Sequence, residues 1–179
     1  MLTAKNCKAS TAVQYFTDDY DPGQTRWIGK GASGLDLEGE IDRGEFENVC
    51  YGKSPDGTKY LGTKGDPDKR RAGTDFTFSA PKSLSLTALV GGDTRLEVAH
   101  RVAVEKTLAL IEDRYAQTRI TKDKKVAEVK TGNLVVAQFN HIDEPRGRSA
   151  AAHSRAGDES NSSREWQVVC QRQRSNFSE

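Results

Sequence analysis

The sequence contains no apolar run approaching the roughly 18 residues that a membrane-spanning helix needs. Its first residues lack the apolar core of a secretory signal, and its three cysteines are too far apart for a disulfide framework or a zinc site. The net charge is only +1, so any affinity for DNA must come from local groups of basic side chains. These absences predict a cytoplasmic protein that does not enter the membrane.

The last 37 residues differ in composition from the rest of the chain. No Leu, Ile, Met, Lys, Thr or Tyr occurs from Asp143 to Glu179, whereas six Arg and seven Ser do. Such a segment cannot bury enough apolar surface to offset the entropy lost on ordering. We therefore expect an ordered part at residues 1–142 and a disordered tail at 143–179.

Apolar spacing within residues 1–142 predicts both helices and strands. Helices are expected at 10–16, from residue 42 onward and at 94–119, with Thr94 as the capping residue of the last. Strands are expected at 35–41, 75–79 and 133–139, while 81–90 is ambiguous between strand and helix. Because strands and helices do not alternate regularly along the chain, as they do in a parallel β-α-β sheet, an α+β domain with antiparallel pairing is expected.

Two tyrosines near the N-terminus are candidate nucleophiles. Tyr15 and Tyr20 flank Asp18 and Asp19. A tyrosine hydroxyl stays protonated at neutral pH, so it attacks only where a carboxylate accepts its proton and a cation neutralises the electrophile, typically a phosphodiester. The alternative is that both are half-buried aromatic residues near the end of a helix.

Other candidate residues are acidic, basic or metal-ligating. Asp75 lies in an expected strand rich in aromatic residues, where burying a carboxylate is costly unless the carboxylate is paired or functional. The alternative is that Asp75 lies at a strand edge and faces water. Lys82 and the pair Arg70 and Arg71 are candidate phosphate contacts, or else solvated charges. His141 follows an apolar strand and is either a metal ligand or an ordinary hydrogen-bonded histidine.

Several sequence blocks, in order and spacing, resemble a known family over about residues 1–142. The most specific is the aromatic block around Asp75. Together the blocks resemble the N-terminal domain of conjugative relaxases of the MobF (TrwC/TraI) type. They are Ala12-Val-Gln-Tyr-Phe16, Asp18-Asp-Tyr20, Trp27-Ile-Gly-Lys-Gly-Ala32, Leu35-Asp-Leu-Glu-Gly-Glu40, Thr74-Asp-Phe-Thr-Phe-Ser-Ala-Pro-Lys-Ser83 and Thr131-Gly-Asn-Leu-Val-Val-Ala-Gln-Phe-Asn-His141.

This resemblance implies an HUH endonuclease on an antiparallel-sheet palm. Such enzymes nick one DNA strand at a plasmid transfer origin, leave a 5′-phosphotyrosyl intermediate and later religate the strand. Tyr15 matches the first nucleophile, Tyr20 the second, Asp75 the carboxylate that orients a metal-binding histidine, and His141 the first of three metal ligands. The implied partners are single-stranded origin DNA, relaxosome accessory proteins and Mg²⁺ or Mn²⁺.

The chain departs from the family pattern after His141. The other two metal histidines belong to a motif like S-R-x-x-D-P-Q-L-H-T-H, which is absent. Degenerate codons for residues 144–160, translated one base later, admit S-R-E-A-D-P-Q-L-H-T-H-A-L-V-M-N. We interpret 143–179 as off-frame and the palm as incomplete, which leaves strand 133–139 with an unpaired edge. Impaired relaxase activity is expected; the alternatives are an inactive DNA-binding remnant and a non-functional truncated product.

Overall fold

The computed structural model describes residues 1–19, 23–62, 64, 66, 69–122, 125–141 and 165–172. No helix among these residues is long and apolar enough to cross a membrane. The elements follow in the order β1 (Leu2–Lys8), α1 (Ala9–Asp19), β2 (Thr25–Ile28), α2 (Lys30–Ser33), α3 (Arg43–Cys50), β3 (Arg71–Ser79), α4 (Lys82–Leu89), α5 (Thr94–Tyr115), β4 (Gln117–Lys122), β5 (Lys125–Lys130), β6 (Leu134–His141) and β7 (Glu165–Arg172).

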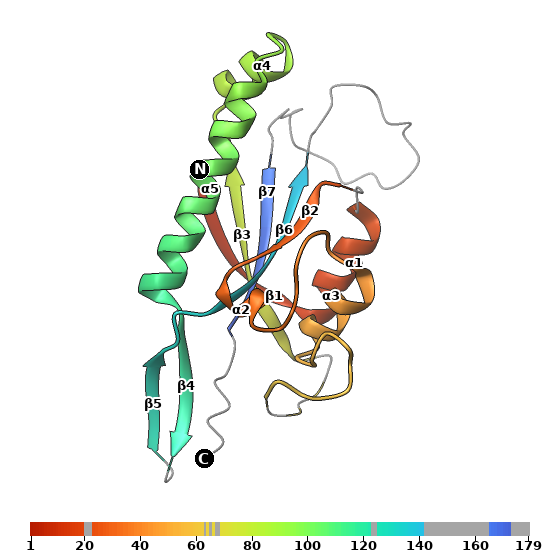
Figure 1. Cartoon of the computed structure of the whole chain (residues 1–179), viewed down its shortest axis with the longest axis vertical. Coiled ribbons are helices and arrows are strands. Elements are labelled where there is room, and N and C mark those ends of the chain that lie inside the picture. The colour runs from red at the N-terminus through yellow and green to blue at the C-terminus, as the bar shows by residue number, and fades with distance from the viewer. Residues whose placement is uncertain are drawn as a thin grey trace.

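Five strands form one antiparallel sheet in the order β1-β3-β7-β6-β2. Helices α1 and α3 cover one face of this sheet and α5 covers the other (Figure 1). Strands β4 and β5 pair only with each other and form a separate hairpin that extends away from the sheet (Figure 1). The expected α+β domain with antiparallel pairing is thus confirmed.

Strand β6 separates two hydrophobic cores. Its residues Val135, Ala137 and Phe139 pack in the core on the α1 and α3 face, whereas Leu134 and Val136 pack in the core on the α5 face. Alternate side chains of a strand point to opposite faces, so a strand covered on both faces is apolar throughout. The continuous apolar run that predicted a strand at 133–139 is explained by this double burial.

Helices α3 and α5 begin where short polar side chains cap them. Asp42 accepts hydrogen bonds from the backbone N–H of Gly44 at 2.7 Å and of Glu45 at 3.0 Å, which confirms the helix start expected there. Helix α5 is capped by Asp93, one residue before the expected Thr94, and ends at Tyr115 rather than residue 119. The chain then continues into β4, because 117–122 pairs with β5.

Two further expectations are corrected or resolved. Residues 35–41 form a loop instead of a strand, because Asp36 and Gly39 have φ of 57° and 73°, which an extended chain does not adopt. Leu37 and Ile41 are nevertheless buried, and their burial accounts for the alternating apolar pattern. The ambiguous segment 81–90 is helix α4, which packs on α5.

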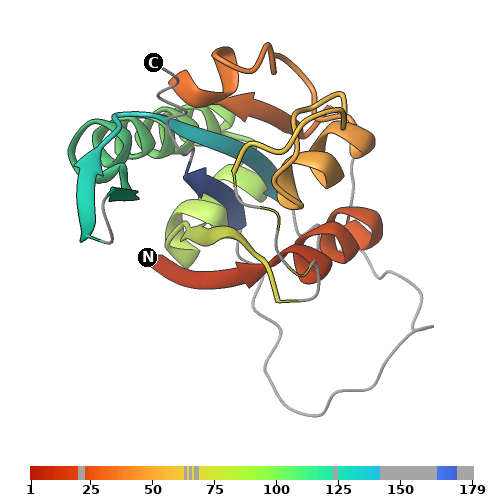
Figure 2. The same ribbon diagram turned by 90° about the horizontal axis from the view of Figure 1, so that it is seen from below.

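Strand β7 overturns two expectations about the C-terminal part of the chain. Glu165–Arg172 was expected to be disordered, but it pairs with β3 on one side and with β6 on the other (Figure 2). The expected unpaired edge of β6 is therefore also wrong, since β6 lies between β7 and β2. Backbone hydrogen bonding to two neighbours compensates for a composition poor in large apolar residues. Residues 143–164 and 173–179 lie outside the described part.

Glu112 is a buried carboxylate that joins three elements. Its Oε1 accepts hydrogen bonds from the backbone N–H of Lys30 and of Leu134, both at 2.8 Å, so α5 is tied to α2 and β6. The close approach requires glycine at two positions of the Gly29-Lys-Gly31 segment. A Cβ at Gly29, whose φ is 100°, would lie 2.4 Å from the Leu134 carbonyl oxygen, and one at Gly31 would lie 2.7 Å from it.

Replacement of Glu112 by Ala should lower the free energy of unfolding by about 2–4 kcal/mol, because two backbone N–H groups lose their acceptor inside the protein. Glu112→Gln is the matched control, since its amide oxygen can still accept both hydrogen bonds. Urea unfolding followed by circular dichroism measures the difference. Equal midpoints for the Ala and Gln variants would contradict this role of Glu112.

Candidate functional site

The candidate catalytic elements meet at one end of the sheet. Strand β3 ends at Ser79 and β6 ends at His141, and both residues lie opposite Glu165 of β7. Helix α1 leads back to this end, because the next strand, β2, begins at Thr25 opposite Phe139. In Figure 1 this is the upper end of the sheet. The sequence blocks around Tyr15, Asp75 and His141 therefore belong to elements that approach the same end of the sheet, although β7 separates β3 from β6.

Of the two predicted nucleophiles, the structure describes only the backbone position of Tyr15. Tyr15 lies on α1, three residues after Ala12, which is buried in the core that also contains Ala137 and Phe139. Only the backbone of Tyr15 is described, and Tyr20 lies outside the described residues. Helix α1 thus has a fixed position against the sheet, and the roles of both tyrosines stay predictions.

Asp75 lies in the middle of β3 and is half-buried. It is opposite Lys5 of β1 and Val169 of β7. Val169 is four residues along β7 from Glu165, the residue opposite His141, so Asp75 and His141 are not neighbours in the sheet. The proposed role of Asp75 in orienting a metal-binding histidine stays a prediction.

Asp75 acts electrostatically on a nearby thiol. Partial burial raises the pKa of Cys7 above its usual value, and the negative charge of Asp75 raises it further, while Lys5 opposes the shift. Both effects favour the neutral thiol, because burial and a nearby anion each disfavour a thiolate. Cys7 is therefore a chemical reporter of the charge on Asp75.

Replacement of Asp75 by Asn should lower the pKa of Cys7 and speed its alkylation at pH 8, because removing the carboxylate charge raises the thiolate fraction. The measurement is the iodoacetamide reaction rate of the Cys7 peptide against pH, followed by mass spectrometry. Asp36→Asn, a charge removal in the 35–41 loop, is the control and should leave the rate unchanged. Identical pH profiles for the Asp75→Asn variant and the unaltered chain would rule out this coupling.

The predicted DNA contacts fall at opposite ends of β3. Lys82 begins α4, just beyond the end of β3, and only its backbone is described. Arg71 begins β3 and donates to the Gly73 carbonyl oxygen at 3.1 Å and to Thr74 Oγ1 at 2.7 Å. The Arg70 guanidinium packs so closely on Gly52 that a Cβ there would lie 1.7 Å from Nη2. The structure therefore separates Arg70 and Arg71 from Lys82.

The described side chains do not supply a metal centre. No group of three or more His, Cys, Asp or Glu that could hold an ion occurs among the side chains that the structure describes. The His141 side chain is outside that set, and residue 141 has Glu165 as its neighbour in β7. The metal-ligand role expected of His141 therefore lies outside the described side chains and stays a prediction.

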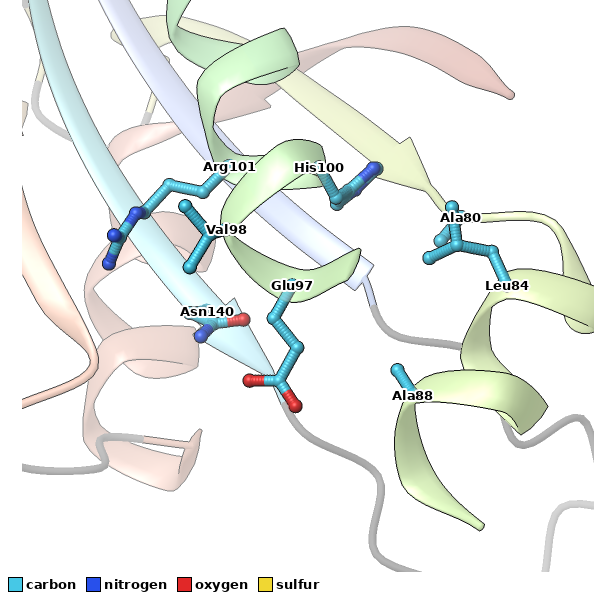
Figure 3. A pocket seen from close by; sticks show the side chains of 8 residues that line it. All are labelled: Ala80, Leu84, Ala88, Glu97, Val98, His100, Arg101 and Asn140. Atoms are coloured by element: carbon cyan, nitrogen blue, oxygen red, sulfur yellow. The ribbon is translucent and has the colours of Figure 1, made fainter. Parts of the chain in front are cut away.

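A polar cluster on the α5 face was not singled out from the sequence. Arg26 Nε donates to Gln138 Oε1 at 2.9 Å, and Arg26 also forms an ion pair with Glu105 of α5. Arg101 lies near the same carboxylate, with Nε 3.9 Å from Glu105 Oε1. Asn140 lies beside Arg101 at the end of β6 (Figure 3). The available signal was the spacing of Gln138 and Asn140, two amides two residues apart in an apolar strand.

Comparison with known proteins extends the similarity across most of the chain. The family model described as TrwC relaxase matches residues 3–157, which is 15 residues beyond the expected boundary at 142. Multifunctional conjugation protein TraI of Escherichia coli (strain K12) is 39% identical over 161 residues, and TraI of Escherichia coli is 40% identical over 151. These matches cover 87% and 82% of this chain, but only 9% and 8% of the relatives.

Solved structures share both the fold and the sequence similarity. Conjugative relaxase TrwC in complex with oriT DNA matches in a metal-free form with a TM-score of 0.74 and in a metal-bound form with 0.75, each at 33% identity. Both matches cover 95% of this chain, and 55% and 56% of the TrwC chains respectively. The protein belongs to the TrwC relaxase family and corresponds to the N-terminal relaxase domain of the MobF type.

Proposed function

We propose that this chain binds single-stranded DNA of a plasmid transfer origin and that its relaxase activity is impaired. The observation that supports the proposal is the meeting of α1, β3 and β6 at one end of a sheet that has the fold of relaxases solved with oriT DNA. We include in this proposal a cytoplasmic location and accessory proteins that present the origin DNA.

The reaction proposed for the family member is a transesterification by Tyr15. The tyrosine oxygen attacks the scissile phosphorus, the new P–O bond replaces the bond to the 3′ oxygen, and that oxygen leaves as a 3′ hydroxyl once protonated. Because a tyrosine hydroxyl is protonated at neutral pH, a base must take its proton. Asp75 is proposed for that task, since it is a half-buried carboxylate on a strand that α1 packs against.

We attribute the impaired relaxase activity to missing metal ligands, because the candidate nucleophile Tyr15 is present in the sequence. A cation on the phosphate neutralises the charge that develops in the transition state and is one of the larger contributions to such reactions. The sequence has histidines only at positions 100, 141 and 153 and lacks the motif that carries two of the family's three metal ligands, so we derive no step through a metal ion in this chain. TrwC has been solved in a metal-bound form, which supports a metal dependence in the family.

We also propose that residues 143–179 are translated from a shifted frame. The support is the change in composition at residue 143 and the family-like string that the shifted codons admit. Sequencing the gene from codon 140 onward tests this directly. A family-like continuation after a one-base correction is expected, and a shifted frame without similarity to relaxases would refute the proposal.

DNA binding by the full chain should depend steeply on salt. Lys82, Arg70 and Arg71 would make about three phosphate contacts. For single-stranded DNA this predicts a slope of about −2 when the logarithm of the association constant is plotted against the logarithm of the salt concentration. Binding should therefore be about 20-fold weaker at 200 mM salt than at 50 mM. A strand that reaches all three must run along β3 for about 30 Å. Fluorescence anisotropy with a labelled oriT oligonucleotide measures the slope.

Charge-removal variants identify the contacts in that experiment. Lys82→Ala, Arg70→Ala and Arg71→Ala should each reduce the slope by about 0.7, because each removes one phosphate contact. Lys125→Ala, on the separate β4–β5 hairpin, is the matched control and should leave the slope unchanged. The absence of binding at 50 mM salt would refute the proposed DNA-binding function.

A further inference from the structure

A small polar hollow lies on the α5 face of the sheet, between β2, α5 and β6. Its lining includes two arginines, Arg26 and Arg101, and two amide side chains, Gln138 and Asn140. Its volume is about 80 Å³, which is several times the space that one water molecule needs. This volume is too small for a nucleotide or a drug-sized ligand, but it has room for one small ion.

The hollow lies on the opposite face of the sheet from α1, the helix that carries Tyr15. Alternate side chains of a strand point to opposite faces, and Ala137 and Phe139 of β6 pack in the core on the α1 side. Gln138 and Asn140 therefore point to the α5 side. A ligand in this hollow is separated by the sheet from α1 and from any group bound beside Tyr15.

Gln138 carries a buried donor that the described residues do not use. The residue is only 1% exposed and lines the hollow. Its Oε1 accepts from Arg26 Nε at 2.9 Å, and because a guanidinium only donates, this contact fixes the orientation of the amide. The other amide atom, Nε2, is buried and has no hydrogen-bond partner among the described residues. A donor buried in this way needs an acceptor, and a bound ligand can supply it.

Asn140 adds a second donor to the hollow. Its backbone N–H donates to the Gln24 carbonyl oxygen at 2.9 Å, and its Nδ2 donates to Gln24 Oε1 at 2.7 Å, so the side chain is held in place. An amide nitrogen carries two N–H groups, which leaves one for a ligand. In Figure 3 the Asn140 nitrogen points to the side of Arg101 and the oxygen to the side of Glu97. The hollow beside Arg101 is therefore lined by groups that donate.

The charged groups at the hollow leave a net positive charge. Arg26 forms an ion pair with Glu105, and Arg101 Nε lies 3.9 Å from the same carboxylate. Two positive charges and one negative charge give a sum of +1 for this group. The Glu97 carboxylate borders the adjoining hollow between α4 and α5, on the other side of Asn140 in Figure 3. A small anion beside Arg101 compensates the remaining charge.

We propose that this hollow binds one small free oxyanion, of the class of inorganic phosphate or sulfate. Gln138 Nε2 donates to one oxygen of the anion, and Asn140 Nδ2 and the Arg101 guanidinium donate to others. Hydrogen bonds between a cationic donor and an oxyanion are about twice as strong as those between neutral groups. The anion satisfies the buried donor and ties β6 to α5. This site does not depend on the proposed function, because it requires no DNA.

Titration of the full chain with inorganic phosphate, and separately with sulfate, tests the site directly. The ionic strength is held constant with sodium chloride, so that general screening does not change. The side-chain NH₂ resonances of Gln138 and Asn140, observed by ¹⁵N NMR, are expected to shift and to reach saturation with both oxyanions. Water alone in the hollow would give no saturable shift, and this result would overturn the proposal.

Variants separate the site from general electrostatic attraction, with phosphate binding measured by isothermal titration calorimetry. Gln138→Leu and Arg101→Gln should each weaken phosphate binding at least about tenfold, because each removes a hydrogen bond to a charged ligand. Arg114→Gln, in the last turn of the same helix, is the matched control and should leave the affinity unchanged. Arg101 is 49% exposed, so its variant keeps the test valid even where Gln138→Leu does not fold. Equal weakening by the Arg114 variant would overturn the assignment.

An oligonucleotide distinguishes this inference from the proposed function. An excess of single-stranded dT12 should leave the affinity for phosphate unchanged, because the hollow and α1 lie on opposite faces of the sheet. Displacement of the bound phosphate by dT12 would assign these donors to the DNA-binding surface and overturn the proposal of a separate anion site. Saturable phosphate binding by a chain that binds no oligonucleotide would support the anion site and refute the proposed function.

Discussion

A chain that ends at residue 164 should lose its cooperative unfolding transition. Removal of β7 separates the five-stranded sheet into the pairs β1-β3 and β6-β2, because β7 is the strand that joins β3 to β6. Two-stranded pairs are marginal in water, and the freed edges of β3 and β6 would associate with other chains. The expected loss is comparable to the whole stability of a domain, about 5–15 kcal/mol.

Two further chains make this prediction specific to β7. A chain that ends at Arg172 keeps the strand and should unfold like the full protein. Val168→Pro removes a backbone N–H within the central strand and should be severely destabilising, whereas Val168→Thr should have a small effect. Urea unfolding and hydrogen exchange of β3 and β6 measure these differences. Equal unfolding midpoints for the chains ending at 164 and 172 would contradict the placement of β7.

Cleavage of single-stranded oriT DNA by this chain should be at least 100-fold slower than cleavage by the TrwC relaxase under the same conditions. Loss of about 3 kcal/mol of transition-state stabilisation is enough for this factor, and a metal on the phosphate contributes several kcal/mol. The motif that carries the other two metal histidines of the family is absent from the sequence after His141. The tyrosine nucleophile alone cannot compensate, since its hydroxyl is a weak nucleophile while protonated.

A labelled oligonucleotide cut on a denaturing gel, with Mg²⁺ and with Mn²⁺, measures this rate. Tyr15→Phe is the control that removes any remaining activity of the nucleophile. Addition of either cation should change the rate of this chain by less than twofold, whereas a metal-dependent relaxase should respond strongly. Cleavage within tenfold of TrwC that requires Tyr15 would show that a working metal site forms.

The elements that follow local rules were predictable from the sequence. Asp42 caps α3 because a short carboxylate fits the free N–H groups of a helix start, and strand β6 is apolar because both its faces are buried. The loop at 35–41 was mistaken for a strand because Leu37 and Ile41 are buried at alternate positions without being extended. Alternating apolar residues indicate that side chains are buried, but they do not require an extended backbone. The positive φ angles of Asp36 and Gly39 make this segment a loop.

Strand β7 could not be predicted from its composition. Residues 165–172 are flanked by polar segments in which Phe177 is the only large apolar residue, so the local entropy argument favoured disorder. Its place in the sheet depends on two partners, β3 and β6, that lie far away in the sequence. Pairing between distant segments stabilises a strand without leaving a local signal, which is why the prediction failed for this segment.

The sequence could predict which residues belong to the candidate site, but it could not predict their relative positions in the sheet. The block around Asp75 identified the family, yet only the register shows that Asp75 and His141 are four strand positions apart along β7. The same block could not show that Arg70 and Arg71 lie at the far end of β3 from Lys82. Gln138 and Asn140 were overlooked because polar residues in a strand are ordinarily assigned to a solvent-facing side.

Covalent capture of DNA tests the central claim, that this relaxase-family chain binds single strands without breaking them efficiently. The full chain is incubated with labelled single strands that contain 12 random positions, in Mg²⁺ and in Mn²⁺, and is analysed on native and denaturing gels. A shifted band on the native gel, with no protein–DNA adduct on the denaturing gel, is the predicted result. An abundant adduct that disappears in Tyr15→Phe would contradict the account.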